Sequence, residues 1–110
     1  MKKITLFCGA GMSTSILVKR MRNVAAKEGK DYDINAFAMQ DLEKGFDSDV
    51  ILIGPQIRYA IDAVRKRFPD IPVDSIPMRM YGIQDAPSVI AIAEKLMEEA
   101  EEKKNEGEQN

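Results

Sequence analysis

The sequence predicts an α/β protein: a small three-layer domain of about four parallel strands, with helices on both faces of the sheet. Short apolar segments rich in β-branched residues alternate with segments of helical apolar spacing. The segment VILI is apolar at every position, which is typical of a strand covered on both sides. A length of 110 residues with 45% apolar residues suits one folded domain.

The first unit of the chain is predicted to be a strand, a tight loop and a helix. Residues 3–8 (KITLFC) form a short apolar segment of good β-formers. Small, flexible residues follow, and helical spacing then begins. The positions that carry this spacing are Leu17, Met21, Val24 and Glu28.

Three more strands are expected, at residues 31–39, 49–54 and 73–77. The polar connection 40–48 has room for one short helix. Because strands and helices alternate, the strands should run parallel, joined by right-handed crossovers.

Two further helices are predicted from apolar stripes. The first spans Ile57 to Phe68 and ends near Pro69. Its apolar residues, Ile57, Ala60, Ile61, Val64 and Phe68, lie at i, i+3, i+4, i+7 and i+11. The second begins at about Pro87, with Asp85 as a candidate cap. Its apolar residues are Val89, Ile90, Ala93, Leu96, Met97 and Ala100.

The C-terminal end is expected to be an acidic, polar tail. Residues 98–110 hold six Glu and two Lys and lose the apolar spacing. The last helix should continue into them for a turn or two before it frays. We therefore predict a single domain over residues 1–104 and a disordered tail over 105–110.

Charge and hydropathy exclude several classes of function. The net charge is −2, and no basic stripe indicates a nucleic-acid partner. The apolar runs are only a few residues long, well short of the roughly 20 that cross a bilayer, and the N-terminus lacks the apolar core of a signal peptide. We therefore expect a cytoplasmic protein.

The chain has one cysteine and no histidine. A single cysteine in a reducing compartment stays a free thiol. Without histidine, the chain cannot supply Cys-His or Ser-His-Asp catalysis, nor the usual imidazole ligands of zinc or iron. We predict no metal and no cofactor.

Cys8 ends the first strand and borders a loop that enters a helix. Backbone N–H groups at such a loop, together with the helix dipole, favour an anion. Glycines permit close approach of a ligand, and hydroxyls add hydrogen bonds; these residues are Gly9, Gly11, Ser13, Thr14 and Ser15. The same field should lower the pKa of Cys8 and favour a nucleophilic thiolate that could carry a phosphoryl group.

A simpler interpretation of Cys8 stays open at this point. Free cysteine is among the most buried residue types and often fills apolar space at the end of a strand. The glycine and hydroxyl residues beside Cys8 favour the anion site, because a filler needs no such neighbours.

Three segments resemble one protein family. They are LFCGAGMSTSILV, DVILIGPQIRY (49–59) and MYGIQDAPSV (80–89). The sequence resembles the IIB components of the bacterial phosphoenolpyruvate-dependent sugar phosphotransferase system, in particular the lactose/cellobiose (diacetylchitobiose) group. The resemblance covers roughly residues 3–97.

This resemblance implies a phosphotransferase subunit that works as a phosphoryl relay. A IIA protein carrying phosphohistidine would donate to Cys8, which would pass the group to a β-linked disaccharide bound by the membrane IIC transporter. The expected phosphate-binding residues are Gly9, Ala10, Gly11, Met12, Ser13, Thr14 and Ser15. The resemblance further implies a monomer in peripheral association with IIC.

The family's fold is also similar to that of low-molecular-weight tyrosine phosphatases, which use a Cys-X5-Arg loop and an acid, typically in an Asp-Pro pair. Here Thr14 stands six residues after Cys8, and the chain contains no Asp-Pro pair. Two alternatives to the relay stay open: a phosphatase or arsenate-reductase-like enzyme, and a non-enzymatic anion-sensing regulatory module.

Three other residues are candidates for contact with a partner or for a place beside the site. Gln56 follows the third strand and can reach either the loop or a partner. Arg58 can meet a phosphorylated partner, although an exposed arginine is often only solvated surface. Tyr81 can line the site or simply close the core.

Overall fold

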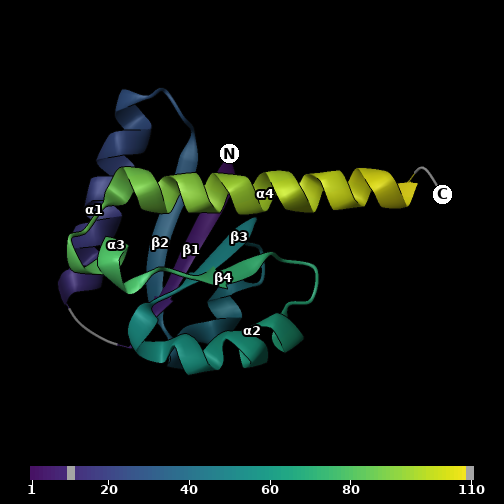
Figure 1. Ribbon diagram of the computed structural model, residues 1–110, viewed down its shortest axis with the longest axis horizontal. Coiled ribbons are helices and arrows are strands. Elements are labelled where there is room, and N and C mark those ends of the chain that lie inside the picture. Colours follow the sequence, from purple (N-terminus) through teal and green to yellow (C-terminus); the bar gives the residue numbers. More distant parts are fainter. Residues whose placement is uncertain (10–11, 109–110) are drawn as a thin grey trace.

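The computed structural model describes residues 1–9 and 12–108, and only the backbone of residues 12, 13 and 106–108. Within this part of the chain, four parallel strands form one sheet in the order β2-β1-β3-β4 (Figure 1). The predicted fold class and all four strands are confirmed. The strands are β1 (Lys2–Cys8), β2 (Tyr32–Ala38), β3 (Val50–Ile53) and β4 (Val73–Ser75).

The direction of winding reverses between β1 and β3. The chain passes from β1 outward to β2, then returns to the other side of β1 to form β3 and finally β4. In open α/β sheets, ligands bind beyond the carboxyl ends of the strands at such a reversal. Cys8 ends β1, and Gly54 follows β3 on the neighbouring strand, with its N–H donating to the Phe7 carbonyl at 2.8 Å.

Helices cover both faces of the sheet, as predicted. Helices α1 (Met12–Lys27) and α4 (Ala86–Glu108) pack on the face that carries Leu6 and Cys8 of β1. Helix α2 (Ile61–Arg67) packs on the opposite face, which carries Phe7. Side chains alternate between the faces of a strand, so Cys8 belongs to the α1 and α4 side of the core.

The predicted helix at 57–68 is only partly α-helical. A 3₁₀ helix, η2 (Pro55–Ala60), comes first, and α2 begins at Ile61. Within η2, Ile57 has φ −121° and ψ 31°, and its N–H donates to the Gly54 carbonyl at 3.1 Å. Four of the five residues predicted to lie on one helical stripe are still buried, because this turn points Ile57 and Ala60 into the core; Ile61 is partly buried.

Two short helices form part of the remaining connections. The polar segment after β2 forms a 3₁₀ helix, η1 (Met39–Gly45). The helix α3 (Met78–Gly82) lies between β4 and α4 and was not predicted. Strand β4 is also shorter than expected: after Ile76 donates to the Ile53 carbonyl at 2.8 Å, Pro77 has no N–H with which to extend the sheet.

Helix α4 begins where the sequence predicted. The Asp85 carboxylate accepts hydrogen bonds from the Ser88 N–H at 3.3 Å and the Ser88 hydroxyl at 2.7 Å, which caps the helix. The helix then runs to Glu108, further than the turn or two that we expected beyond residue 98. Glu, Lys and Ala are good helix formers, so this segment continues the helix past the end of the sheet (Figure 1).

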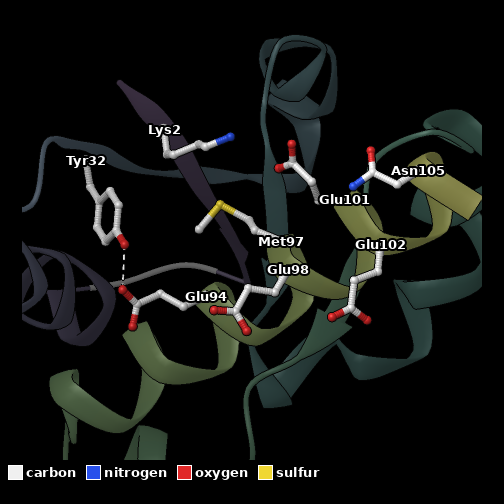
Figure 2. A pocket seen from close by; sticks show the side chains of 8 residues that line it. All are labelled: Lys2, Tyr32, Glu94, Met97, Glu98, Glu101, Glu102 and Asn105. Carbon is white, nitrogen blue, oxygen red and sulfur yellow. Dashed lines mark hydrogen bonds between the residues drawn. The ribbon is translucent and has the colours of Figure 1, made fainter.

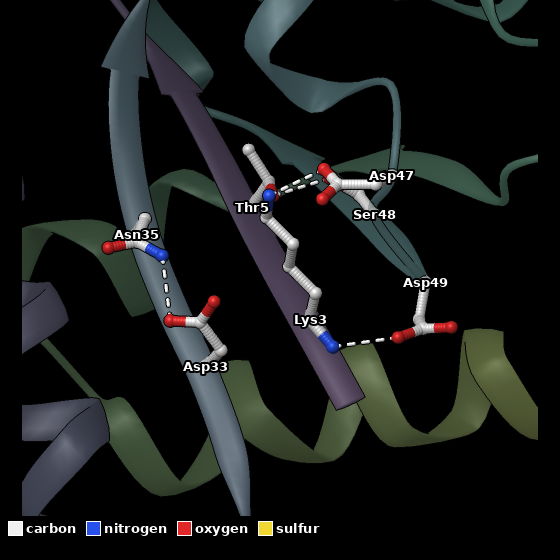
Figure 3. A network of polar contacts seen from close by, with 7 residues as sticks. All are labelled: Lys3, Thr5, Asp33, Asn35, Asp47, Ser48 and Asp49. Carbon is white, nitrogen blue, oxygen red and sulfur yellow. Dashed lines mark hydrogen bonds and ion pairs between the residues drawn. The ribbon is translucent and has the colours of Figure 1, made fainter. Parts of the chain in front are cut away.

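Polar side chains join the amino-terminal half of the sheet to the loop before β3 (Figure 3). The Lys3 N–H donates to the Asp49 carboxylate at 2.7 Å, and the Lys3 ammonium donates to Asp47. The hydroxyls of Thr5 and Ser48 share a buried hydrogen bond. These contacts satisfy polar groups at the end of the sheet opposite Cys8.

Candidate functional site

Cys8 is a buried free cysteine at the carboxyl end of the central strand β1, with 4% of its surface exposed. Its neighbour on the adjacent strand is Gly54, which directly follows the last residue of β3, Ile53, and precedes η2. The sequence placed Cys8 at this edge of the sheet, and the structure confirms it.

Two hydrogen-bonding groups contact the thiol. The Thr14 hydroxyl, from the first turn of α1, and the Gly54 N–H both lower the pKa of Cys8, but burial raises it by more, so the pKa lies above its ordinary value of 9.0. The expected lowering of this pKa is therefore wrong for the resting protein. Removing the sulfur from water costs the charged form more than these two donors return.

Thr14 connects Cys8 to Tyr81. The Thr14 and Tyr81 hydroxyl oxygens are 2.8 Å apart, and both residues are buried. Tyr81 lies on α3, within the same apolar cluster as Cys8. Tyr81 therefore closes the core, as one of the two interpretations made from the sequence had it, and it also bonds a neighbour of Cys8. Its predicted place in the functional site stays a prediction.

The remaining loop residues are only partly described. Gly9 is exposed, and Ser15 is exposed on the first turn of α1. Met12 and Ser13 begin α1, while Ala10 and Gly11 lie outside the described residues. The predicted role of the loop residues from Gly9 to Ser15 as phosphate ligands stays a prediction.

Gln56 lies beside the site, and Arg58 lies on the surface. The side-chain oxygen of Gln56 is 3.3 Å from where a Cβ on Gly54 would stand, and the Cys8 sulfur is 3.2 Å from the same point. The two residues thus flank Gly54. Arg58 is exposed on η2.

Exposed apolar side chains belong to elements that follow the carboxyl ends of the strands. They are Ile16 at the start of α1, Tyr59 on η2, and Met78 and Ile83 at the two ends of α3. Such side chains on the ligand-binding edge of a sheet suit contact with another protein.

Two cavities lie away from Cys8. One of about 350 Å³ and one of about 250 Å³ lie along α4 and share Lys2 at the start of β1, and neither includes Cys8. Figure 2 shows the side chains that line the first cavity, among them four glutamates of α4: Glu94, Glu98, Glu101 and Glu102. The side chains of the described residues form no cluster that could hold a metal ion.

Comparison with known proteins identifies the family. The sequence model of the family "PTS system, Lactose/Cellobiose specific IIB subunit" matches residues 3–92. The chain therefore belongs to the lactose/cellobiose IIB family of the sugar phosphotransferase system. It is a sugar-specific IIB component and a phosphotransferase, whose partners in general are IIA and IIC components.

Characterised relatives agree with this assignment. The chain is 42% identical to the galactose-specific EIIB component of Lactococcus lactis subsp. cremoris, over 87% of this chain and 96% of the relative. It has the same identity and coverage with the cellobiose-specific EIIB component of Lactococcus lactis subsp. lactis. It is 37% identical to the oligo-beta-mannoside-specific EIIB component of Bacillus subtilis, over 88% and 97% of the two chains.

Solved structures share the fold. The cellobiose-specific phosphotransferase IIB component of Borrelia burgdorferi matches with a TM-score of 0.75 and 32% identity, over 90% of this chain and 94% of the other. The lactose-specific IIB domain of Streptococcus pneumoniae matches with a TM-score of 0.66 over 92% and 95% of the chains; at 17% identity it supports the fold alone. Over residues 1–9 and 12–108, no helix is long and apolar enough to cross a membrane.

Proposed function

We propose that Cys8 accepts a phosphoryl group from the phosphohistidine of a IIA protein and transfers it to a sugar bound by membrane IIC. The observation that carries this proposal is the position of the chain's only cysteine, at the carboxyl end of β1 beside the winding reversal, in a IIB protein. Burial keeps Cys8 a thiol at neutral pH, since its pKa is raised.

The first transfer then balances as follows. The N–P bond of phosphohistidine breaks and an S–P bond to Cys8 forms. The electron pair of the broken bond stays on the imidazole, which takes up the thiol proton. A neutral donor ring thus leaves, and no histidine is needed from this chain, which has none.

In the second transfer, the S–P bond breaks and an O–P bond to a sugar hydroxyl forms. The sulfur leaves as a thiolate, which the Thr14 hydroxyl and the Gly54 N–H favour. The proton of the sugar hydroxyl must go to a group outside this chain or to water, and Cys8 then regains a proton. We propose a β-linked disaccharide as the acceptor, a class to which the names of the relatives specific for cellobiose and oligo-beta-mannoside point.

The phosphoryl cradle is proposed to be the loop and first turn from Gly9 to Ser15, with Gln56 beside it. Gly9 and Ser15 are exposed, and Thr14 contacts Cys8. The exposed apolar residues Ile16, Tyr59, Met78 and Ile83, together with Arg58, are the proposed contact surface for IIA and IIC. We further propose that the protein is a cytoplasmic monomer that associates with the membrane only through IIC.

Thr14 also bears on the phosphatase alternative. It occupies the place of the phosphatase arginine, and its hydroxyl is engaged by Tyr81. A neutral, engaged side chain at this position supports transfer over rapid hydrolysis of phosphocysteine.

Intact-mass measurement tests the proposal. The protein is incubated with phosphoenolpyruvate, the general phosphotransferase proteins and a cognate IIA; Cys8→Ala serves as the site variant and Phe46→Ala, at an exposed position, as the matched control. We expect one phosphoryl adduct that requires IIA, persists in Phe46→Ala and is absent in Cys8→Ala. An adduct that survives in Cys8→Ala would overturn the proposal. Membranes containing IIC, with cellobiose, a β-mannoside or galactose as acceptor, then test the sugar.

A further inference from the structure

The Thr14–Tyr81 hydrogen bond joins two segments that lie far apart in the sequence. Their hydroxyl oxygens are 2.8 Å apart across 67 residues of chain. Thr14 is 5% exposed and Tyr81 is 8% exposed, so water does not compete freely for either group. Such a bond between two neutral hydroxyls can run in either direction, and the distance alone does not tell which oxygen donates.

A Cys8 thiolate sets the direction of this bond. A thiolate has no proton to donate, so the Thr14 hydroxyl, whose hydrogen bond lowers the pKa of Cys8, donates its one proton to the sulfur. It can then only accept from Tyr81. The chain of donors therefore runs from the Tyr81 hydroxyl to the Thr14 oxygen, and from the Thr14 hydroxyl to the Cys8 sulfur.

We propose that Tyr81 is a positioning residue for phosphoryl transfer: by donating to Thr14, it holds the Thr14 proton toward the Cys8 sulfur. This inference rests on the proposed role of Cys8 as the phosphorylated residue. Tyr81 does not touch the sulfur in this account, and it acts only through Thr14.

A backbone hydrogen bond and core packing fix the position of Tyr81. The Tyr81 N–H donates to the Pro77 carbonyl at 3.1 Å within the single turn of α3. Its ring packs in the cluster that contains Cys8 and the start of α4. Charged groups near the site are screened or otherwise engaged. Arg58 of η2, Arg79 of α3 and the basic residues of α1 are exposed to solvent, and the partly buried Asp85 before α4 accepts hydrogen bonds from Ser88.

The contribution should be largest where sulfur carries charge. A hydrogen bond to a charged acceptor is stronger than one to a neutral acceptor. The oriented Thr14 proton therefore stabilises the thiolate that leaves when the sugar takes the phosphoryl group. When Tyr81 does not donate, the Thr14 hydroxyl is free to rotate away from sulfur, and that stabilisation weakens.

The test is the pH profile of Cys8 alkylation by iodoacetamide in the isolated protein. Tyr81→Phe keeps the ring and removes its hydroxyl. Thr14→Val removes the hydroxyl that links Tyr81 to Cys8, and Thr14→Ser keeps that hydroxyl. We expect Tyr81→Phe to move the alkylation profile to higher pH, equivalent to about a fivefold loss of thiolate at a given pH. Thr14→Val should move it at least as far, and Thr14→Ser should leave it close to wild type.

A double variant distinguishes positioning from a general effect on packing. If Tyr81 acts through Thr14, Tyr81→Phe causes no further shift in the Thr14→Val background. An equal shift in both backgrounds, or no shift in wild type, would overturn the proposal. Urea unfolding of each variant confirms that the profiles come from folded protein.

This experiment is independent of the relay itself. Alkylation needs neither IIA nor IIC. A shifted alkylation profile in Tyr81→Phe, together with no phosphoryl adduct on wild type, would therefore contradict the proposed function and still support the positioning role of Tyr81. An adduct on wild type with an unchanged alkylation profile in Tyr81→Phe would support the proposed function and contradict the positioning role of Tyr81.

Discussion

Gly54, directly after β3, leaves no room for a side chain beside Cys8 of the neighbouring strand β1. A Cβ on Gly54 would lie 3.2 Å from the Cys8 sulfur and 3.5 Å from the Cys8 Cβ. The N–H of Gly54 also lowers the pKa of Cys8. The absence of a side chain at position 54 therefore lets the backbone approach the sulfur.

We expect Gly54→Ala to crowd Cys8. The added methyl group is closer to sulfur and to the Gln56 oxygen than ordinary contacts allow, so either the backbone or Cys8 must shift. The free energy of unfolding should fall by roughly 1 kcal/mol, and alkylation of Cys8 should slow. Gly82→Ala is the matched control, since a Cβ there meets nothing within 4 Å. Equal behaviour of the two variants would contradict this prediction.

Phe7 and Phe46 should differ sharply in their contributions to stability. Phe7 is fully buried, and its ring centroid lies 6.2 Å from that of Phe37, whereas Phe46 is 70% exposed. Phe7→Ala should lower the free energy of unfolding by about 3–5 kcal/mol. Phe46→Ala should change it by less than about 0.5 kcal/mol. Urea unfolding of both variants checks this, and a small effect at Phe7 would show that the core is packed differently.

Cys8 should make stability fall in mildly alkaline solution. Burial raises its pKa above the ordinary value of 9.0, so the unfolded chain releases this proton first as the pH rises. The stabilising contribution is complete below the unfolded pKa and is lost as the pH rises through the folded pKa. Between about pH 8 and pH 10, the urea midpoint of wild type should fall more steeply than that of Cys8→Ala. Parallel curves would rule out a raised pKa.

Tyr32 should ionise late in an ultraviolet titration. Burial, followed by its hydrogen bond to the Glu94 carboxylate (Figure 2), raises the pKa of Tyr32 to about 12. Tyr32→Phe should remove this late step. Glu94→Gln should move the step toward lower pH without abolishing the effect of burial. Persistence of the late step in Tyr32→Phe would assign it to another of the three tyrosines.

Local sequence patterns predicted most of the fold but only part of the site. The apolar segments marked all four strands, and Asp85 marked the start of α4, because these signals depend on neighbouring residues. Helix α3 was missed because its five residues are too few to display a helical period. The 3₁₀ geometry of η2 was missed because its burial pattern matches that of an α-helix.

The site itself depends on contacts that no local pattern encodes. Cys8 was placed correctly, but the direction of its pKa shift depends on how deeply the folded chain buries it. The pairing of Thr14 with Tyr81 spans 67 residues and a helix that was not predicted. A buried hydroxyl of Thr14 has to find a partner, and that requirement was the one signal in the sequence that a second polar group would be nearby.

The central place of β1 also determines when the protein can fold during synthesis. Ile4 pairs with Ile34 on one side and Val50 on the other, so β1 must wait for two strands that are made after it. Closing loops of this length is slow compared with forming a local turn. Until β3 emerges, one edge of β1 has no partner, and until α2 and α4 follow, its two apolar faces lack part of their cover. Cys8, which α4 helps to bury, therefore stays accessible to oxidants until the last helix has been made.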